Sequence, residues 1–287
     1  MKPSRFWLVF ALVTTFFWGV WGAFIEVPEK AGFPATLGYS VWALTMVPCA
    51  LIALGINDFK LHRDRRAVVL CSIVGFLGAG GQLILFQALR TGPAYLVFPI
   101  ISLYPVVSVF LSAMLLKERT TRRVWTGIAL AFPAVVMLSY QPPSERGPHG
   151  FGWLALAIAV ALMWGVQAYV MKVSTAKIPA ESVFFYMMAT AVVLVPVAIG
   201  MTDFSRPVFW GFKGPWLAAL VQSLNSIGAL SLVYALRHGK AIVVVPMTAL
   251  APVLTVVLSL FLYGVVPHPV VATGLVSASL AIFLMAE

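Results

Sequence analysis

Long apolar stretches dominate the chain and are separated by short polar connections. A membrane-spanning helix needs about 20 consecutive, mostly apolar residues, and ten segments meet this requirement. Runs such as 154–165 do not alternate between apolar and polar positions, so they predict helices rather than the strands of a membrane barrel. A helix also satisfies its own backbone hydrogen bonds in lipid. The expected spans are 6–27, 35–55, 67–89, 93–116, 123–140, 151–171, 182–201, 214–236, 241–264 and 268–286.

The composition agrees with a membrane protein and excludes several other classes. Of the 287 residues, 61% are hydrophobic and 10% are charged, whereas a soluble domain carries about 25% charged residues. A net charge of +10 is also typical of nucleic-acid-binding proteins, but here the basic residues lie between apolar segments, so we expect no nucleic-acid partner. The two cysteines lie in apolar segments and the four histidines are scattered, which predicts no disulfide, no metal site and no other cofactor.

Basic residues are distributed unevenly over the connections between the ten segments. Cytoplasmic connections of membrane proteins carry an excess of Lys and Arg. With ten spans, 14 of the 19 basic residues fall on the side that holds both termini. Both termini are therefore expected to be cytoplasmic. The 14 residues are Lys2, Arg5, Lys60, Arg63, Arg65, Arg66, Lys117, Arg119, Arg122, Arg123, Lys172, Lys177, Arg237 and Lys240, and the opposite side has Lys30, Arg90, Arg146, Arg206 and Lys213.

The two halves of the chain align with each other at a nearly constant shift. At a shift of 147 residues, the matched pairs include Arg90/Arg237, Pro99/Pro246, Pro105/Pro252 and Gly127/Gly274, and at a shift of 146, Trp18-Gly19 matches Trp164-Gly165. Matched prolines, glycines and arginines are informative because apolar residues in two membrane helices match by chance. The alignment predicts a first five-helix repeat at 1–140, a linker at 141–150 and a second five-helix repeat at 151–287.

An odd number of spans in each repeat has a topological consequence. The second repeat must enter the membrane from the opposite side, so the expected fold is an all-α integral membrane protein with two inverted five-helix repeats. Prolines in the fourth and ninth spans are expected to kink those helices. Inverted repeats place a substrate site near the middle of the membrane, where rocking of the halves alternates its access. The pattern favours transport, although channels also contain inverted repeats.

The stretch 86–138 resembles the drug/metabolite transporter superfamily, in its ten-helix EamA-like branch. The resemblance rests on a proline-broken fourth span, on Lys117-Glu118-Arg119 and on Gly127, together with the two Trp-Gly pairs. The chain departs from the family at Tyr39 and Trp42, where an arginine is common, and at Val265, the repeat mate of Glu118. We therefore expect Glu118 to have a structural role, paired locally with Arg119, Arg122 or Arg123. The resemblance implies a secondary transporter.

Polar and aromatic side chains within the spans are the candidates for a substrate site. A polar group in hydrocarbon requires a partner or a water-filled cavity, and helical spacing places several of these residues on matched faces of the two repeats. The alternative roles are hydrogen bonding between helices for the amides, close helix packing for the glycines, and a position at the membrane interface for the aromatic residues. The substrate-binding candidates are Trp18, Trp21, Gln82, Tyr104, Trp164, Gln167, Gln222, Asn225 and Thr248.

Glu26 is the candidate for coupling transport to protons. It lies near the outer end of the first span, and its repeat mate Lys172 lies near the inner end of the sixth. A carboxyl group close to hydrocarbon tends to hold its proton. Both residues also fit ordinary interfacial side chains that extend to the headgroups. Facilitated exchange without protons therefore stays open as an alternative.

The resemblance implies export of small metabolites of the amino-acid or nucleobase type, by secondary transport or exchange, and the expected location is a prokaryotic inner membrane. Superfamily members that carry sugars suggest an alternative, uptake of a sugar or another small polar nutrient. A membrane enzyme is disfavoured because no histidine or aspartate lies centrally in a span, and a lipid-carrier module is disfavoured by the doubled length. The expected partners are the substrate, the lipid bilayer and protons, and a monomer is expected to suffice.

Overall fold

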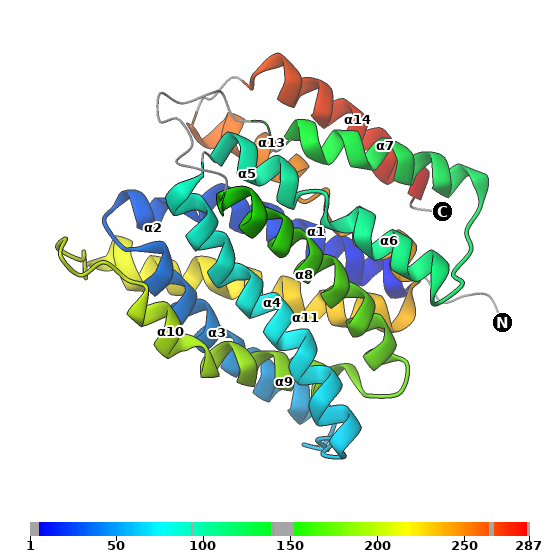
Figure 1. Cartoon of the computed structure of the whole chain (residues 1–287), viewed down its shortest axis with the longest axis horizontal. Coiled ribbons are helices and arrows are strands. Elements are labelled where there is room, and N and C mark those ends of the chain that lie inside the picture. Colours follow the sequence, from blue (N-terminus) through cyan, green and yellow to red (C-terminus); the bar gives the residue numbers. More distant parts are fainter. Residues whose placement is uncertain (1–5, 93, 139, 141–151, 264–266, 286–287) are drawn as a thin grey trace.

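A computed structural model describes residues 6–92, 94–138, 140, 152–263 and 267–285. These residues form a bundle of helices and contain no β-strand (Figure 1). Helix α1 begins and α14 ends at the right-hand side of Figure 1, whereas α2 and α10 lie on the opposite side. The expected linker at 141–150 lies outside the described residues, so the domain bounds stay predictions.

The helices follow the expected segments closely. In the first half, α1 is Phe6–Phe24, α2 is Glu26–Lys30, α3 is Ala35–Ile56, α4 is Arg65–Thr91, α5 is Ala94–Ile101, α6 is Tyr104–Met114 and α7 is Arg122–Leu138. In the second half, α8 is Gly152–Thr175, α9 is Ala180–Val193, α10 is Val195–Gly200, α11 is Leu217–His238, α12 is Ala241–Thr248, α13 is Pro252–Tyr263 and α14 is Pro269–Met285. A short π-helix, η1, at Phe212–Trp216 precedes α11. Each expected span therefore corresponds to one helix or to two consecutive helices.

Prolines account for the breaks within three of these segments. Pro105 lies in the first turn of α6, and Pro252 is the first residue of α13. A proline has no N–H to donate to the preceding turn, so the helix stops before it and a new helix begins. The expected kinks are thus full breaks at Pro105 and Pro252, whereas Pro246 lies inside the continuous helix α12. A third break, at Leu194, separates α9 from α10, whose second residue is Pro196, and this break was not expected.

Apolar surface covers much of the molecule. Among the described residues, seven helical segments are long and apolar enough to span a membrane: 6–30, 35–56, 65–91, 152–175, 180–200, 212–238 and 241–258. Helices α6 and α14 are shorter apolar helices. Large side chains such as Phe261, Ile56 and Val193 point outwards and are exposed. A soluble protein rarely exposes apolar surface on this scale, so the chain is an integral membrane protein with several spans.

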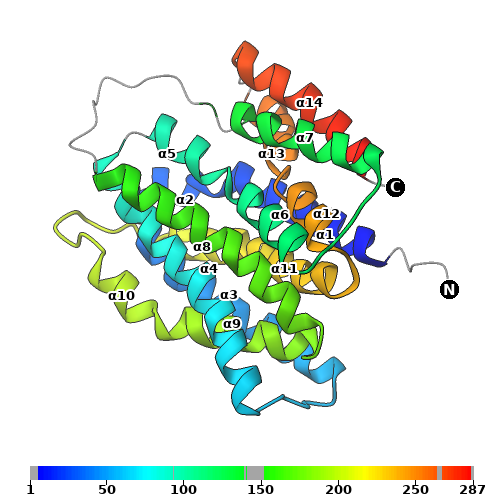
Figure 2. The same ribbon diagram turned by 45° about the vertical axis from the view of Figure 1, so that its right-hand side comes forward.

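Helices of the two halves interleave in equivalent pairs. Helix α1 packs along α11, and its counterpart α8 packs along α4. In the same way α3 contacts α11 and α9 contacts α4, while α7 and α14 pair with each other (Figure 2). The largest hydrophobic core cluster draws on both halves. The most extensive helix contacts therefore join one repeat to the other.

The α7–α14 pair shows how closely the two halves correspond. A Cβ atom at Gly127 would lie 2.8 Å from Met285 Cγ, and a Cβ atom at Gly274 would lie 2.7 Å from Met137 Cβ. Only glycine permits such a close approach of the two helices. Gly127 and Gly274 are matched at the shift of 147, and each meets the last turns of the opposite helix. The duplication therefore extends to individual side-chain contacts.

Candidate functional site

Most of the candidate residues lie in two helix pairs. Trp18 and Trp21 on α1 face Gln222 and Asn225 on α11, and contacts between these helices are extensive. The second pair, α4 and α8, holds Gln82, Trp164 and Gln167. Tyr104 on α6 and Thr248 on α12 complete the set. Helix α12 contacts α6, α8 and α11, so it connects the two groups.

Trp18 and Trp164 occupy equivalent positions and make equivalent hydrogen bonds. The Trp18 indole N–H donates to the backbone carbonyl of Asn225, at 3.3 Å. The Trp164 indole N–H donates to the backbone carbonyl of Gly78, at 3.2 Å. Asn225 and Gly78 are themselves matched at the shift of 147. Both bonds join helices of different repeats, so each tryptophan holds two helices together.

The same two tryptophans also lie directly against glycines of the neighbouring helix. A Cβ atom at Gly228 would lie 2.5 Å from Trp18 Cδ1, and a Cβ atom at Gly81 would lie 2.6 Å from Trp164 Nε1. A side chain at either glycine would therefore displace the indole ring. These contacts give Trp18 and Trp164 the packing role that the sequence left open. A direct contact with substrate stays a prediction for both.

Trp21 and Gln222 form a side-chain hydrogen bond between α1 and α11. The Trp21 indole N–H donates to Gln222 Oε1 at 3.1 Å, and Gln222 is 6% exposed. The repeat mate of Trp21 is Gln167, whose amide lies close to Gly78. In the described part of the chain, the Gln167 amide has no hydrogen-bond partner. The two halves therefore differ here, because one pairs its polar side chains with each other and the other has an amide without a partner among the described residues.

Three further candidates differ in how far their polar groups are satisfied. The Tyr104 ring packs edge-on against Trp164, with ring centroids 6.2 Å apart. Thr248 is buried, and its hydroxyl donates within its own helix to the carbonyls of Val244 and Val245, each at 3.1 Å. Gln82 is partly exposed, and among the described residues its amide has no partner. The structure thus brings Tyr104 to Trp164, whereas the Thr248 hydroxyl already has partners.

Helix α3 carries polar groups that were not among the substrate-binding candidates. The Thr45 and Ser226 hydroxyls lie 2.9 Å apart and join α3 to α11. Trp42 Nε1 and Ser40 Oγ are buried and have no hydrogen-bond partner among the described residues. Buried donors without a partner are uncommon in proteins. The departure from the family pattern at Trp42 was the signal in the sequence that could have added this residue to the candidates.

Glu26 lies at the surface, at the start of α2. Its carboxylate forms an ion pair with Lys30 at 2.6 Å, and the Glu26 side chain is 65% exposed. This position matches the interfacial alternative, and a role in proton coupling stays a prediction. The repeat mate Lys172 is placed differently, because its ammonium group donates to the carbonyls of Leu236 and Gly239, at 2.8 and 2.5 Å. Lys172 therefore caps the C-terminal end of α11.

Glu118 has a distant partner instead of the expected arginine neighbours. Its Oε2 atom accepts a hydrogen bond from the backbone N–H of Ile242, at 3.0 Å. Ile242 lies in the first turn of α12, where backbone N–H groups have no partner within the helix. A carboxylate is stabilised at such an end by the hydrogen bond and by the helix dipole. The expectation of a local ion pair with Arg119, Arg122 or Arg123 was wrong, although the role of Glu118 is structural as expected.

Comparison with known proteins agrees with this architecture. An uncharacterised protein of Methanocaldococcus jannaschii is 30% identical over 132 residues, which are 46% of this chain and 95% of that protein. A solved crystal structure covers 99% of this chain and 96% of its own chain, with a TM-score of 0.78 at 20% identity, and it establishes the fold. The EamA-like transporter family matches twice, over residues 5–140 and 151–286. A membrane bundle built from two such repeats confirms the resemblance to the drug/metabolite transporter superfamily, and the chain belongs to the EamA-like transporter family.

Proposed function

We propose that the protein is a secondary transporter that exports small amino-acid-like or nucleobase-like metabolites by alternating access. It crosses a prokaryotic inner membrane ten times, as two inverted five-helix repeats with both termini in the cytoplasm. The substrate class and the direction follow the family resemblance, and alternating access is supported by one observation, a difference between two equivalent segments of the repeats. These are α5 with the turn that follows it, and α12 with its corresponding turn.

The two equivalent segments are buried to different extents. All eight residues of α12 are buried. In α5, Phe98 and Ile100 are partly exposed, although their counterparts Val245 and Met247 are buried. In the turns that follow, Leu103 is 39% exposed whereas its counterpart Leu250 is 0% exposed. Closely matched sequences therefore occupy two different environments.

The more buried segment, α12, also makes the more extensive contacts with the opposite repeat. Helix α12 packs against α6, α1 and α7 of the first repeat, and its contact with α1 is the counterpart of the contact between α5 and α8. Helix α5 packs mainly against α8, and its other principal contacts are with α4 and α7 of its own repeat. The second repeat thus closes onto the first through α12, while among the described residues α5 makes no contact of similar extent with α13 or α14. Two inverted halves in different conformations are what one end-state of an alternating-access cycle requires.

Polar contacts reinforce the closed end. Besides the Glu118 bond to Ile242, the Lys240 ammonium donates to the Arg119 carbonyl. The bonds of Lys172 to the end of α11 lie in the same region. These residues lie at the end that the charge distribution assigns to the cytoplasm, so the proposal assigns this conformation to the state that is closed towards the cytoplasm and open outwards. Opening inwards would break these bonds and form new contacts around α5.

Thiol labelling in proteoliposomes tests this proposal. In a background with Cys49→Ala and Cys71→Ala, Leu103→Cys should react readily with a membrane-impermeant thiol reagent, and the matched Leu250→Cys should be protected. A substrate that drives the cycle should slow the first reaction and accelerate the second. A screen of radiolabelled amino acids and nucleobases, loaded inside the vesicles, supplies that substrate and reports efflux. Equal reactivities that no transported compound changes would contradict alternating access, and uptake without efflux would contradict export.

A further inference from the structure

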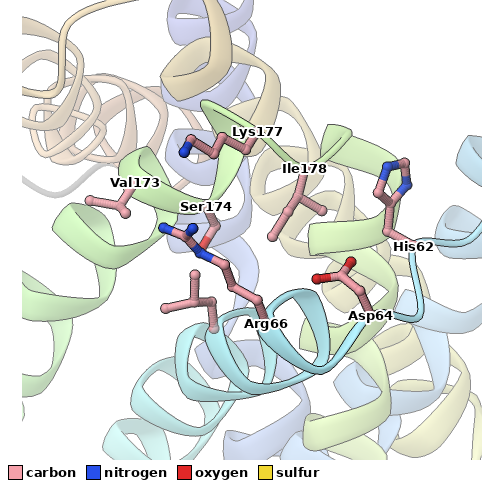
Figure 3. Close-up of a pocket in the computed structure, with 8 residues that line it drawn as sticks. His62, Asp64, Arg66, Val173, Ser174, Lys177 and Ile178 are labelled. Carbon is pink, nitrogen blue, oxygen red and sulfur yellow. The ribbon is translucent and has the colours of Figure 1, made fainter.

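A small pocket lies between the two repeats, away from the candidate substrate residues. Its lining comes from the 62–70 region, where α4 begins, and from 173–178, where α8 ends, and its volume is about 160 Å³ (Figure 3). One water molecule in the liquid occupies about 30 Å³. The pocket therefore has room for a group the size of a phosphate with a few attached atoms.

The pocket carries positive charge from both repeats. Arg66 of the first repeat extends its guanidinium group towards Ser174 of the second, and Lys177 lies at the same end of α8 (Figure 3). Within the described residues, neither basic side chain has a hydrogen bond or an ion pair. Asp64 also lines the pocket, but its carboxylate accepts the N–H of Ala67 as the N-cap of α4. Two unpaired cations thus remain available to a ligand.

The loop that forms one wall of the pocket is held in place by α9. The His62 backbone N–H donates to Ser182 Oγ at 3.1 Å, and the Tyr186 hydroxyl donates to the His62 carbonyl at 2.8 Å. His62 is exposed and lines the pocket. Because hydrogen bonds already hold the backbone at His62, this loop loses less conformational entropy when a ligand binds.

We propose that this pocket binds a phosphate group that bridges the two repeats. Arg66 and Lys177 supply charge-assisted hydrogen bonds to the phosphate oxygens. The pocket lies at the ends of two membrane helices, where phospholipid headgroups are found. The phosphate therefore belongs either to an anionic lipid or to a soluble phosphate ester, and both sources present the same chemistry to the pocket.

Thermal unfolding of the purified full-length protein in a neutral detergent tests the site. The probes are phosphatidylglycerol, phosphatidylcholine, inorganic phosphate and glycerol 3-phosphate. The test variant is Arg66→Gln/Lys177→Gln, and the matched control is Arg65→Gln/Arg122→Gln. Both variants remove two positive charges from exposed positions, and the control residues lie outside the pocket lining. A third variant, Lys177→Arg, retains the charge and checks that the fold tolerates a change at this position.

The expected result is that a phosphate-bearing probe raises the melting temperature of the wild type, the control and Lys177→Arg. The test variant should require at least about tenfold more of the probe for the same shift, because two charge-assisted bonds are lost. Stabilisation by phosphatidylglycerol alone identifies a lipid headgroup, and equal stabilisation by glycerol 3-phosphate identifies a soluble ester. The proposal is overturned if the test variant and the control respond alike, or if phosphatidylcholine is as effective as phosphatidylglycerol in every variant.

Discussion

Gln222 and Asn225 lie one helical turn apart on α11 and offer a matched pair of substitutions to leucine. The Gln222 side-chain oxygen accepts the Trp21 indole N–H, whereas the Trp18 indole N–H donates to the backbone carbonyl of Asn225. Replacing Gln222 by leucine therefore removes a side-chain acceptor. Replacing Asn225 by leucine leaves the tryptophan bond in place. Both changes replace an amide by an apolar side chain of similar size, but only Gln222→Leu is expected to destabilise the fold.

The magnitudes follow from the surroundings of each side chain. Gln222→Leu leaves the Trp21 N–H without its partner in a region where Gln222 is 6% exposed, and an unsatisfied buried donor costs about 1–3 kcal/mol of folding free energy. Adding Trp21→Phe removes that donor, so the double variant should recover about 1 kcal/mol relative to the sum of the single changes. Asn225→Leu should change the free energy of unfolding by less than about 0.5 kcal/mol.

The assay measures unfolding and substrate affinity on the same detergent-purified variants. If the Asn225 amide binds the transported compound, Asn225→Leu should weaken binding by about 1–3 kcal/mol while its melting temperature stays near that of the wild type. Gln222→Leu should melt earlier. The assignment of roles would be refuted by a stable Gln222→Leu variant, by an unstable Asn225→Leu variant, or by normal substrate affinity in the latter.

Three further predictions concern the symmetry, the coupling and the topology. Gly81→Ala and Gly228→Ala should each destabilise the fold by about 1–3 kcal/mol, because the new methyl group displaces Trp164 or Trp18. Since these tryptophans are equivalent, thermal unfolding should show effects of similar size for the two variants. Glu26→Gln should abolish accumulation driven by a pH gradient and spare substrate exchange if Glu26 carries the proton, whereas unchanged accumulation leaves it a surface residue. A reporter fused after Glu287 should be cytoplasmic and a tag placed within 141–150 external, and labelling of that tag only from the cytoplasm would contradict the inverted topology.

The positions of the helices could be predicted from sequence because apolar length alone encodes a membrane segment. The break before Pro196 could not, because a proline within a span either kinks the helix or ends it, and neighbouring helices decide which. The equivalence of Trp18 and Trp164 was visible in the aligned repeats. Their hydrogen-bond acceptors were not, because a backbone carbonyl has no signature in the side-chain sequence.

Long-range partners were the other part that the sequence left undetermined. Glu118 has three arginines within five residues, yet its carboxylate binds a backbone N–H that lies 124 residues away. Local charge spacing favours the arginines, whereas the unpaired N–H groups at the start of α12 become available only once the repeats are packed. The amides of Gln82 and Gln167, which have no partner among the described residues, raise the same difficulty. Their surroundings depend on which conformation the repeats adopt.

Because the repeats interleave, each hydrophobic core cluster of the described residues draws on both halves. Helices α1 and α4 find their principal neighbours in α11 and α8, across the boundary between the halves. The contact between the two halves resembles the interface of a symmetric homodimer, except that both partners belong to one polypeptide. Two separately expressed halves should therefore reassemble only by a concentration-dependent association, as in an obligate dimer without a stable monomer. The covalent connection replaces that association by an intramolecular step, so each half always has its partner at a high effective concentration.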